Sequence, residues 1–285
     1  MDLAVIGGGR VGTALAVLLT RAGHRVAAVS GRDGTAARAG RFLPGVPVLA
    51  EAEAAGQAAV VLLGVPDALV VATAARVAPA LRSGAAIVHL SGALGMAALQ
   101  PAEAAGATPI ALHPLQTFPT VESAVERMPG SAAAVTARTE EAFALGEGLA
   151  RDAGALPFRL ADEARPLYHA GAVLASNAVV ALVALAERVL GEAGVDEPVR
   201  KFLPLTRASV ENAGALGPAD ALTGPVVRGD AETVERNLHA LGELAPEAVA
   251  AYVALASAAS AVAAGARRLS EHDRAAIEEV LARWR

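Results

Sequence analysis

The sequence predicts an α/β fold: an N-terminal Rossmann-type, doubly wound sheet followed by an all-helical domain. Short apolar and β-branched runs alternate with alanine-rich helical runs in the first half of the chain, which is typical of a parallel sheet with crossover helices. A glycine-rich turn follows the first apolar run, at Gly7–Gly12. After Asp162 the strand patterns stop and only helical patterns remain.

In chain order, the expected strands are Leu3–Gly7, Val26–Ser30, Val46–Leu49, Val60–Gly64, Ile87–Leu90, Ile110–His113, Ala132–Thr136 and Pro157–Leu160. The helices expected between them are Val11–Ala22, Ala68–Leu81, Ala97–Ala105 and Glu140–Ala153. Later helices are expected at Glu163–Glu192, Val199–Ala213, Ala231–Leu244, Pro246–Leu269 and Asp273–Arg283. We therefore expect a dinucleotide-binding domain over residues 1–160 and a helical domain for substrate binding and dimerisation over residues 161–285.

Composition narrows the function classes. The chain has 285 residues, of which 54% are hydrophobic and 19% charged, enough for two folded domains. The net charge is −5 and the arginines are scattered, which argues against a nucleic-acid surface. There is no cysteine, so disulfides, thiolate nucleophiles and cysteine-ligated metals are excluded, and no metal site is expected.

Two uncharged stretches raise the question of a membrane, Ala170–Ala186 and Ala248–Ala266. Both are rich in alanine, which is too weakly hydrophobic for a spanning helix. We expect both to be buried helices. The first residues also lack the pattern of a signal peptide, so the sequence predicts a cytoplasmic protein without a membrane segment.

The glycine-rich turn fits the dinucleotide fingerprint G-x-G-x-x-G. Gly7 permits the tight turn, Gly9 lets the backbone approach a pyrophosphate, and Gly12 lets the helix pack on the strand. The start of the helix, including Arg10 and Val11, would supply free N–H groups to the phosphates. The plainer alternative is an ordinary glycine-rich turn between a strand and a helix.

The second strand indicates which cofactor is bound. An NAD site usually has an acid there for the ribose hydroxyl, whereas this chain has Ser30-Gly31-Arg32. A hydroxyl and a guanidinium suit a 2′-phosphate, so we expect NADP. Asp33 is the nearest acid, and it could equally cap the next helix.

Three further segments end strands at the edge where such sheets bind ligands. The first, Gly64-Val65-Pro66, is expected to contact the cofactor, and Ser91 in the second is a candidate both for cofactor binding and for catalysis. Gly92 is a substrate candidate and His113, in the third segment, a catalytic one. The alternatives are turn chemistry for the glycines and prolines, and a structural role for the histidine.

Six motifs together resemble one family: GGGRVG, LLGVPD, HLSGALG, LHPLQTF, YHAGAVLASN and LTGPVVRGD. Its members pair a Rossmann-like NADP-binding domain with a helical C-terminal domain of unknown function, within the superfamily of 6-phosphogluconate dehydrogenases, β-hydroxyacid dehydrogenases and ketopantoate reductases. The resemblance covers almost the whole chain. It implies an NADP-dependent oxidoreductase, often dimeric, with its site between the domains.

The β-hydroxyacid dehydrogenases carry a lysine four residues before an asparagine on the first helix of the second domain. Here Asn177 matches the asparagine, but Val173 stands at the lysine position. His169, two turns before Asn177 and on broadly the same face of the expected helix, could supply the proton instead, or it could simply pack at the helix start. Lys201, the only lysine, is a further catalytic candidate. The resemblance also makes Thr223 and Arg228 substrate candidates, Arg228 for a carboxylate; otherwise they form a helix connection.

Three functions follow from these patterns. The leading one is hydride transfer between NADPH and a small 2-oxo or 3-hydroxy acid, with ketopantoate-like substrates included. The second is a nucleotide-binding sensor that has lost catalysis, which Val173 keeps open. The third is an imine reductase resembling pyrroline-5-carboxylate reductase, which would not need the lysine.

Overall fold

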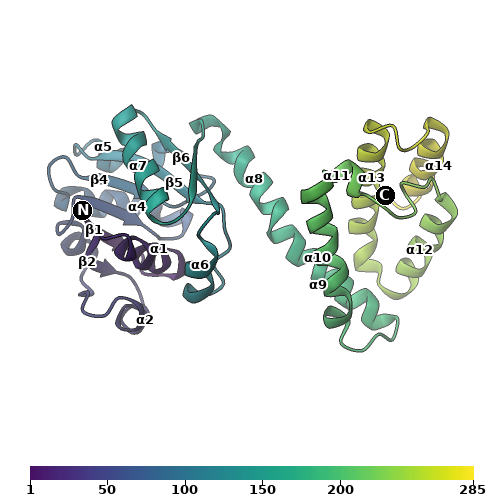
Figure 1. Ribbon diagram of the computed structural model, residues 1–285, viewed down its shortest axis with the longest axis horizontal. Helices are drawn as coiled ribbons and strands as arrows, with labels where there is room; N and C mark the ends of the chain where they lie inside the picture. Colours follow the sequence, from purple (N-terminus) through teal and green to yellow (C-terminus); the bar gives the residue numbers. More distant parts are fainter. The chain divides into compact units, whose positions relative to one another are not determined.

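The computed structural model describes residues 1–285 and divides into two compact units, Met1–Ser176 and Asn177–Arg285. Figure 1 shows the sheet with its helices in the first unit, and helices alone in the second. The division falls later than the expected boundary at residue 160. Helix α8 (Arg165–Ala175) belongs to the sheet unit, because its first residue is buried against the loops of that unit.

One sheet organises the first unit, with the strand order β2-β1-β3-β4-β5-β6-β7. The five strands from β2 to β5 are parallel, β6 runs antiparallel to β5, and β7 is parallel to β6. The order reverses between β1 and β3, which is where doubly wound sheets bind ligands. The strands are β1 Asp2–Ile6, β2 Arg25–Ser30, β3 Val60–Leu63, β4 Ala86–His89, β5 Thr108–Pro114, β6 Ala132–Ala137 and β7 Leu156–Arg159.

Both faces of the sheet are buried, as the continuous apolar runs require. On β1, Leu3 and Val5 pack into one core, while Ala4 and Ile6 pack into the other. Helices α1, α6 and α7 cover the first face, and α3, α4 and α5 cover the second. Their bounds are α1 Arg10–Arg21, α2 Thr35–Phe42, α3 Glu51–Ala55, α4 Asp67–Val77, α5 Gln100–Glu103, α6 Val121–Arg127 and α7 Glu140–Asp152.

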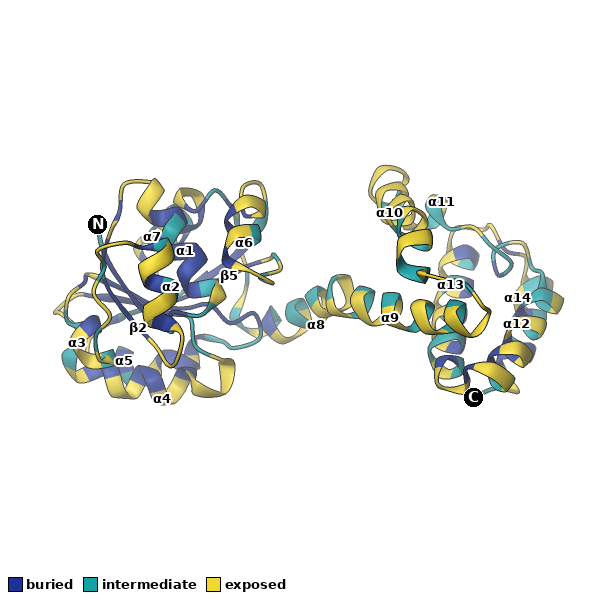
Figure 2. Ribbon diagram, turned by 90° about the horizontal axis from the view of Figure 1, so that it is seen from below, coloured by how far each residue is buried: buried dark blue, intermediate teal, exposed yellow.

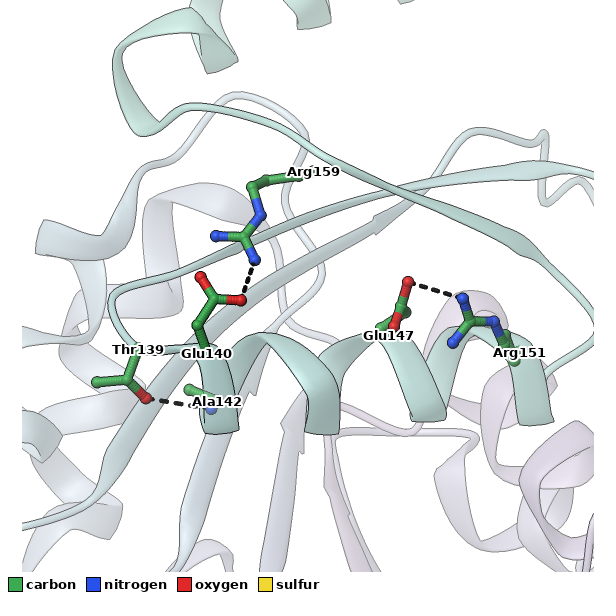
Figure 3. Close-up of polar contacts among 6 residues, drawn as sticks. All are labelled: Thr139, Glu140, Ala142, Glu147, Arg151 and Arg159. Carbon is green, nitrogen blue, oxygen red and sulfur yellow. Dashed lines mark hydrogen bonds and ion pairs between the residues drawn. The ribbon is translucent and has the colours of Figure 1, made fainter.

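Helix α7 shows how side chains set a helix boundary. Thr139 precedes it and accepts a hydrogen bond from the Ala142 N–H at 3.2 Å (Figure 3), which satisfies one of the free donors of the first turn. Glu140 pairs with Arg159 of β7, and this contact lowers the pKa of the Glu140 carboxyl. The expected helix over Glu140–Ala153 is confirmed to within one residue.

One expected strand is wrong. Val46–Leu49 forms only an isolated bridge, between Val48 and Val29 of β2. Pro44 and Pro47 flank and interrupt this segment, and proline has no N–H for a strand ladder. Helices α2, α3 and α6 were not expected, because they are short, with eight, five and seven residues.

The second unit is all-helical, as expected. Its core lies among α12, α13 and α14 and is built on Val234, Leu238, Val253, Ile277 and Leu281. Helix α9 joins through Leu185 and Val189, which pack beside Leu241 of α12. The helices are α9 Asn177–Glu192, α10 Pro198–Leu216, α11 Pro218–Ala221, α12 Ala231–Leu244, α13 Val249–Gly265 and α14 Glu271–Ala282.

The helix expected over Glu163–Glu192 is interrupted. Ser176 has φ −125° and ψ −72°, so α8 ends at Ala175 and α9 begins at Asn177. Figure 2 shows both helices mostly in the colours of exposed and intermediate residues. Arg165 is the only buried residue of the two helices, so the expectation of a buried helix over Ala170–Ala186 is wrong; only its C-terminal part, with Leu185, packs partly against α12.

Two helical stretches are long and apolar enough to cross a membrane by length and composition, Asp162–Glu192 and Pro246–Gly265. In the second stretch, which includes α13, 28% of the most apolar window is buried inside the helical unit. In the first, none of that window is buried. Core helices of soluble proteins pass the same test of length and composition, so these two stretches are weak indications of a membrane protein.

Candidate functional site

Three glycines pack against one another where the strand order reverses. Gly7, which follows β1, has φ +97°, and a Cβ on it would lie 2.5 Å from the carbonyl carbon of Gly64. A Cβ on Gly12 would lie 2.4 Å from the Gly7 oxygen. Only glycine fits at either position. The tight turn at Gly7 and the close packing at Gly12 are therefore confirmed.

Gly9 differs from these three. It precedes the first turn of α1, and a Cβ on it would meet nothing within 4 Å. The first N–H groups of α1 have no helical partner, and its first turn carries no acidic residue. This arrangement fits the pyrophosphate of a dinucleotide, because backbone donors face an open side that no side chain fills.

A cavity of about 730 Å³ adjoins this turn. Of the residues predicted to bind the cofactor, those that line the cavity are Gly7, Gly9, Val11, Ser30, Arg32, Gly64, Val65 and Pro66. Gly12 lies behind Gly7, whereas Arg10 and Ser91 do not line the cavity. The carbonyl of Ser30 accepts hydrogen bonds from the Gly7 and Gly8 N–H groups at 2.8 and 2.9 Å, so the end of β2 holds the glycine turn in place.

Sequence reasoning missed two arginines in this cavity. Arg38 of α2 donates to the Gly8 carbonyl at 2.7 Å, and Arg76 of α4 pairs with Glu51. Arg32 has no ion-pair partner and is exposed. The cavity therefore contains the guanidinium of Arg32, which forms no ion pair, and that of Arg38, whose one hydrogen bond goes to a carbonyl. Arg38 was missed because α2 itself was not expected.

A second cluster lies at the carboxyl ends of β4 and β5, where α8 begins. His113 of β5 and His169 of α8 approach each other with ring centroids 5.9 Å apart, nearly perpendicular. An ideal Cβ on Gly92 would lie 2.5 Å from His169 Nδ1 and 2.9 Å from His113 Nε2. Because Gly92 has no side chain, both ring nitrogens can lie next to its backbone. The structure thus brings these three predicted residues together.

The two histidines of the neighbouring strands are held neutral. Burial, together with the charges of Arg165 and His169, lowers the pKa of His113 to about 4. Burial and Arg165 likewise lower the pKa of His89, the last residue of β4, to about 4. His169 Nδ1 is buried without a hydrogen-bond partner. At neutral pH, therefore, the His113 ring is neutral: it can donate or accept a hydrogen bond, but it is not an imidazolium that could act as a general acid.

Arg165 is fully buried and has no carboxylate partner within ion-pair distance. Its guanidinium donates to the carbonyls of Ser91 at 2.5 Å and Leu94 at 2.6 Å, and to Thr136 Oγ1 at 2.9 Å. The loop after β4 is thus tied to the first turn of α8. Sequence reasoning missed Arg165 because it assigned α8 to the other domain.

The Ser91 hydroxyl is engaged within the loop. It donates to Asp67 Oδ2 at 2.7 Å and accepts from the Ala93 and Leu94 N–H groups at 3.2 and 3.1 Å. Asp162 accepts from the Met96 N–H at 2.8 Å on the far side of the same loop. These contacts hold the loop together; the expected roles of Ser91 in catalysis and cofactor binding stay predictions.

The remaining predicted residues belong to the helical unit. Asn177 is the exposed first residue of α9, and Lys201 is exposed on α10. Thr223 and Arg228 are exposed in the connection between α11 and α12. The break at Ser176 removes the argument that Asn177 shares a helix face with His169, because that argument needs one continuous helix. The roles of these four residues stay predictions.

Two family models match the sequence. Residues 1–114 match a Rossmann-like domain, and residues 131–259 match a domain of unknown function, DUF2520. The chain therefore pairs these two domains, and the expected fold class and family resemblance are confirmed. No curated protein matches the sequence.

Solved structures resemble the chain over most of its length. A proposed NADP oxidoreductase from Bacteroides fragilis is 22% identical, with a TM-score of 0.78 over 91% of this chain and 97% of its own. A Thermotoga maritima protein is 24% identical, with a TM-score of 0.68 over 93% and 99%. An imine reductase from Streptomyces aurantiacus is 16% identical, with a TM-score of 0.65 over 94% and 99%. At these identities the likeness shows the fold.

Proposed function

We propose that this chain, a Rossmann-like domain joined to a DUF2520 domain, is an NADP-dependent oxidoreductase. Its reaction would transfer hydride between NADPH and a small 2-oxo or 3-hydroxy acid, with ketopantoate-like substrates included. The observation that carries the proposal is the combination, at one edge of one sheet, of the glycine turn, its arginine-lined cavity and the histidine pair. The similarity to a proposed NADP oxidoreductase supports it.

NADPH would be held by groups of this chain that are already in position. The first N–H groups of α1 would bind the pyrophosphate beside Gly9. Ser30, Arg32 and Arg38 would bind the 2′-phosphate, because guanidinium groups match phosphate geometry. Ser30, the last residue of β2, stands where the acid of an NAD site usually lies, and the nearest acid in the cavity lining, Asp33, follows three residues later. We therefore expect NADP rather than NAD.

The bound cofactor supplies the hydride, and the protein must orient the substrate and handle a proton. His169 is our proposed general acid. Its Nδ1 is buried against Gly92, so the proton would pass at Nε2. His113 is neutral and can donate a hydrogen bond to the substrate. Val173, at the lysine position of related dehydrogenases, cannot transfer a proton.

Imine reduction is the second candidate, favoured by the likeness to the Streptomyces aurantiacus imine reductase and by the missing lysine. A cyclic imine presents a nitrogen where a 2-oxo acid presents an oxygen, and the same histidines could serve both. A sensor without catalysis would bind NADPH and turn over neither class.

Apolar side chains exposed on α8 and on α9 suggest a homodimer. Leu167 and Leu174 of α8 are 81% and 69% exposed, and Val180 of α9 is 69% exposed. Exposed apolar helix surface of this kind marks an interaction site. We propose that a second copy of the chain covers it, which is consistent with a soluble, cytoplasmic enzyme.

The test is NADPH oxidation by the purified protein, followed by absorbance, with a panel of 2-oxo acids and cyclic imines. Gly9→Ala is the binding-deficient variant. Its Cβ meets no protein atom, so the fold should persist, but the methyl group should block the space that the pyrophosphate would occupy. We expect turnover in the parent and a loss of at least about tenfold in NADPH affinity in Gly9→Ala. NADPH binding without turnover of any panel member would favour the sensor.

A further inference from the structure

Tyr168 of α8 contacts His113, and the proposed reaction gives this tyrosine no role. Its hydroxyl lies 2.8 Å from His113 Nδ1, and the two rings meet edge to face, with centroids 5.5 Å apart at 83°. Phe158 of β7 packs against Tyr168 in a similar way, with centroids 6.0 Å apart. The tyrosine is thus held by packing as well as by its hydrogen bond.

The direction of this hydrogen bond follows from the charge states of the two groups. Burial raises the pKa of the Tyr168 hydroxyl, so it keeps its proton at neutral pH. Its only hydrogen-bond partner in the chain is His113 Nδ1. Tyr168 is half-buried, and leaving its partly desolvated hydroxyl without an acceptor costs free energy, so we infer that the tyrosine donates and Nδ1 accepts.

A neutral imidazole carries one N–H, and an accepting Nδ1 leaves that hydrogen on Nε2. His113 Nε2 is the nitrogen that lies beside Gly92, and it has no partner within the protein. It is also not among the buried, unpartnered polar atoms of the structure, in contrast to His169 Nδ1. The N–H bond of His113 therefore faces the loop after β4, at the ligand edge of the sheet.

We propose that Tyr168 is a positioning residue that fixes His113 in the Nε2–H tautomer, so that His113 donates a hydrogen bond to the oxygen or nitrogen atom that accepts the proton. This role rests on the proposed reductase function. His113 withdraws electron density from the reacting bond without releasing its hydrogen. The proton itself then comes from another group, for which His169 is the proposed source.

Several charged groups act on this pair. Arg165 from the start of α8 and His169 from its second turn disfavour a charge on His113, while Asp67 at the start of α4 favours one. Tyr168 faces the opposite side of the imidazole. Burial and the positive charge of Arg165 prevail over Asp67, so the Nε2–H donor persists without a second proton over the range in which an exposed histidine titrates.

The direct test uses the full chain labelled with ¹⁵N-histidine, without nucleotide, and two-bond ¹H–¹⁵N correlation spectra. The chain has six histidines, so the His113 signals are assigned from a His113→Asn variant. In the parent we expect a single Nε2–H tautomer of His113 that does not titrate between about pH 6 and 9. In Tyr168→Phe, whose ring keeps the packing, we expect both tautomers.

Tyr252→Phe is the matched control. It removes the only other tyrosine hydroxyl, which Asn237 engages in the helical unit at 3.0 Å, and it should leave the His113 spectrum unchanged. An Nδ1–H tautomer in the parent, or an unchanged single tautomer in Tyr168→Phe, would overturn the proposal.

The kinetic readout compares kcat with the affinity for NADPH. Tyr168→Phe should lower kcat by about tenfold, the loss expected for one misdirected hydrogen bond, with NADPH affinity as in the parent. An unchanged kcat in a variant that shows both tautomers would contradict the role in the reaction. If the parent itself turns over no substrate, the proposed function fails, while the spectra still decide the tautomer.

Discussion

Removing the buried guanidinium of Arg165 should destabilise the sheet unit and leave the helical unit unchanged. Arg165→Met fills similar space but leaves the Ser91 and Leu94 carbonyls and the Thr136 hydroxyl without their donor. Each unsatisfied buried acceptor costs about 1–3 kcal/mol. Releasing a desolvated charge offsets part of that loss, so we expect a net destabilisation of about 2–4 kcal/mol.

Two spectroscopic probes together distinguish the unfolding of the two units. Trp284, the only tryptophan, lies in the helical unit, where its ring is 5.1 Å from that of His239. Urea unfolding followed by tryptophan fluorescence therefore reports the helical unit, whereas far-ultraviolet circular dichroism reports both units. In Arg165→Met the dichroism transition should move to lower urea and the fluorescence transition should stay in place.

The control is Arg207→Met, which removes an exposed arginine of α10 that forms no ion pair or side-chain hydrogen bond. It should change the free energy of unfolding by less than about 0.5 kcal/mol. The reasoning would be refuted if Arg165→Met were as stable as the parent, or if both transitions moved equally.

Three further predictions concern the titration, the proton donor and the assembly. The folded-state pKa of His89 lies below its ordinary value of 6.5, at about 4, so its contribution to stability is full above pH 6.5 and is lost as pH falls toward 4. Over that range about 3 kcal/mol should vanish. Since the pKa of His113 is lowered to the same value, His89→Asn should remove about half of the dependence of the urea midpoint on pH. His169→Ala should lower kcat by about a hundredfold or more without changing NADPH affinity. If His169→Ala kept near-parental turnover while Lys201→Ala abolished it, the lysine and not the histidine would be the proton donor. Light scattering at micromolar concentration should give a dimer mass, reduced toward the monomer by Leu174→Asp; a monomeric parent would contradict the proposed assembly.

The sequence predicts best where one local pattern decides the structure. The continuous apolar run of β1 and the spacing of Gly7 and Gly12 are such patterns, because burial of both sheet faces and close backbone packing depend on neighbouring residues. The segment Val46–Leu49 has strand composition, yet its prolines leave only one bridge. There the hydrogen-bonding capacity of the backbone outweighs side-chain preference.

The candidate site depends on contacts that no local pattern contains. Arg165 reads in the sequence as one more solvated charge on an amphipathic helix, and only the fold reveals that its partners lie 71 and 74 residues earlier. Tyr168 was passed over for the same reason, since its partner His113 is 55 residues away. The motif YHAGAVLASN drew attention to His169 and not to the neighbour that engages His113.

The central claim is that this chain binds NADP through the glycine turn, through Arg32 after β2 and through Arg38 of α2. Calorimetric titration of the parent and of Arg32→Ala with NADPH and with NADH tests it most directly. Losing one charge-assisted phosphate contact costs about 1.5–3 kcal/mol. The parent should therefore bind NADPH more tightly than NADH, and Arg32→Ala should lose about tenfold or more in NADPH affinity with NADH affinity unchanged. Equal affinities of the parent for the two cofactors would contradict the claim.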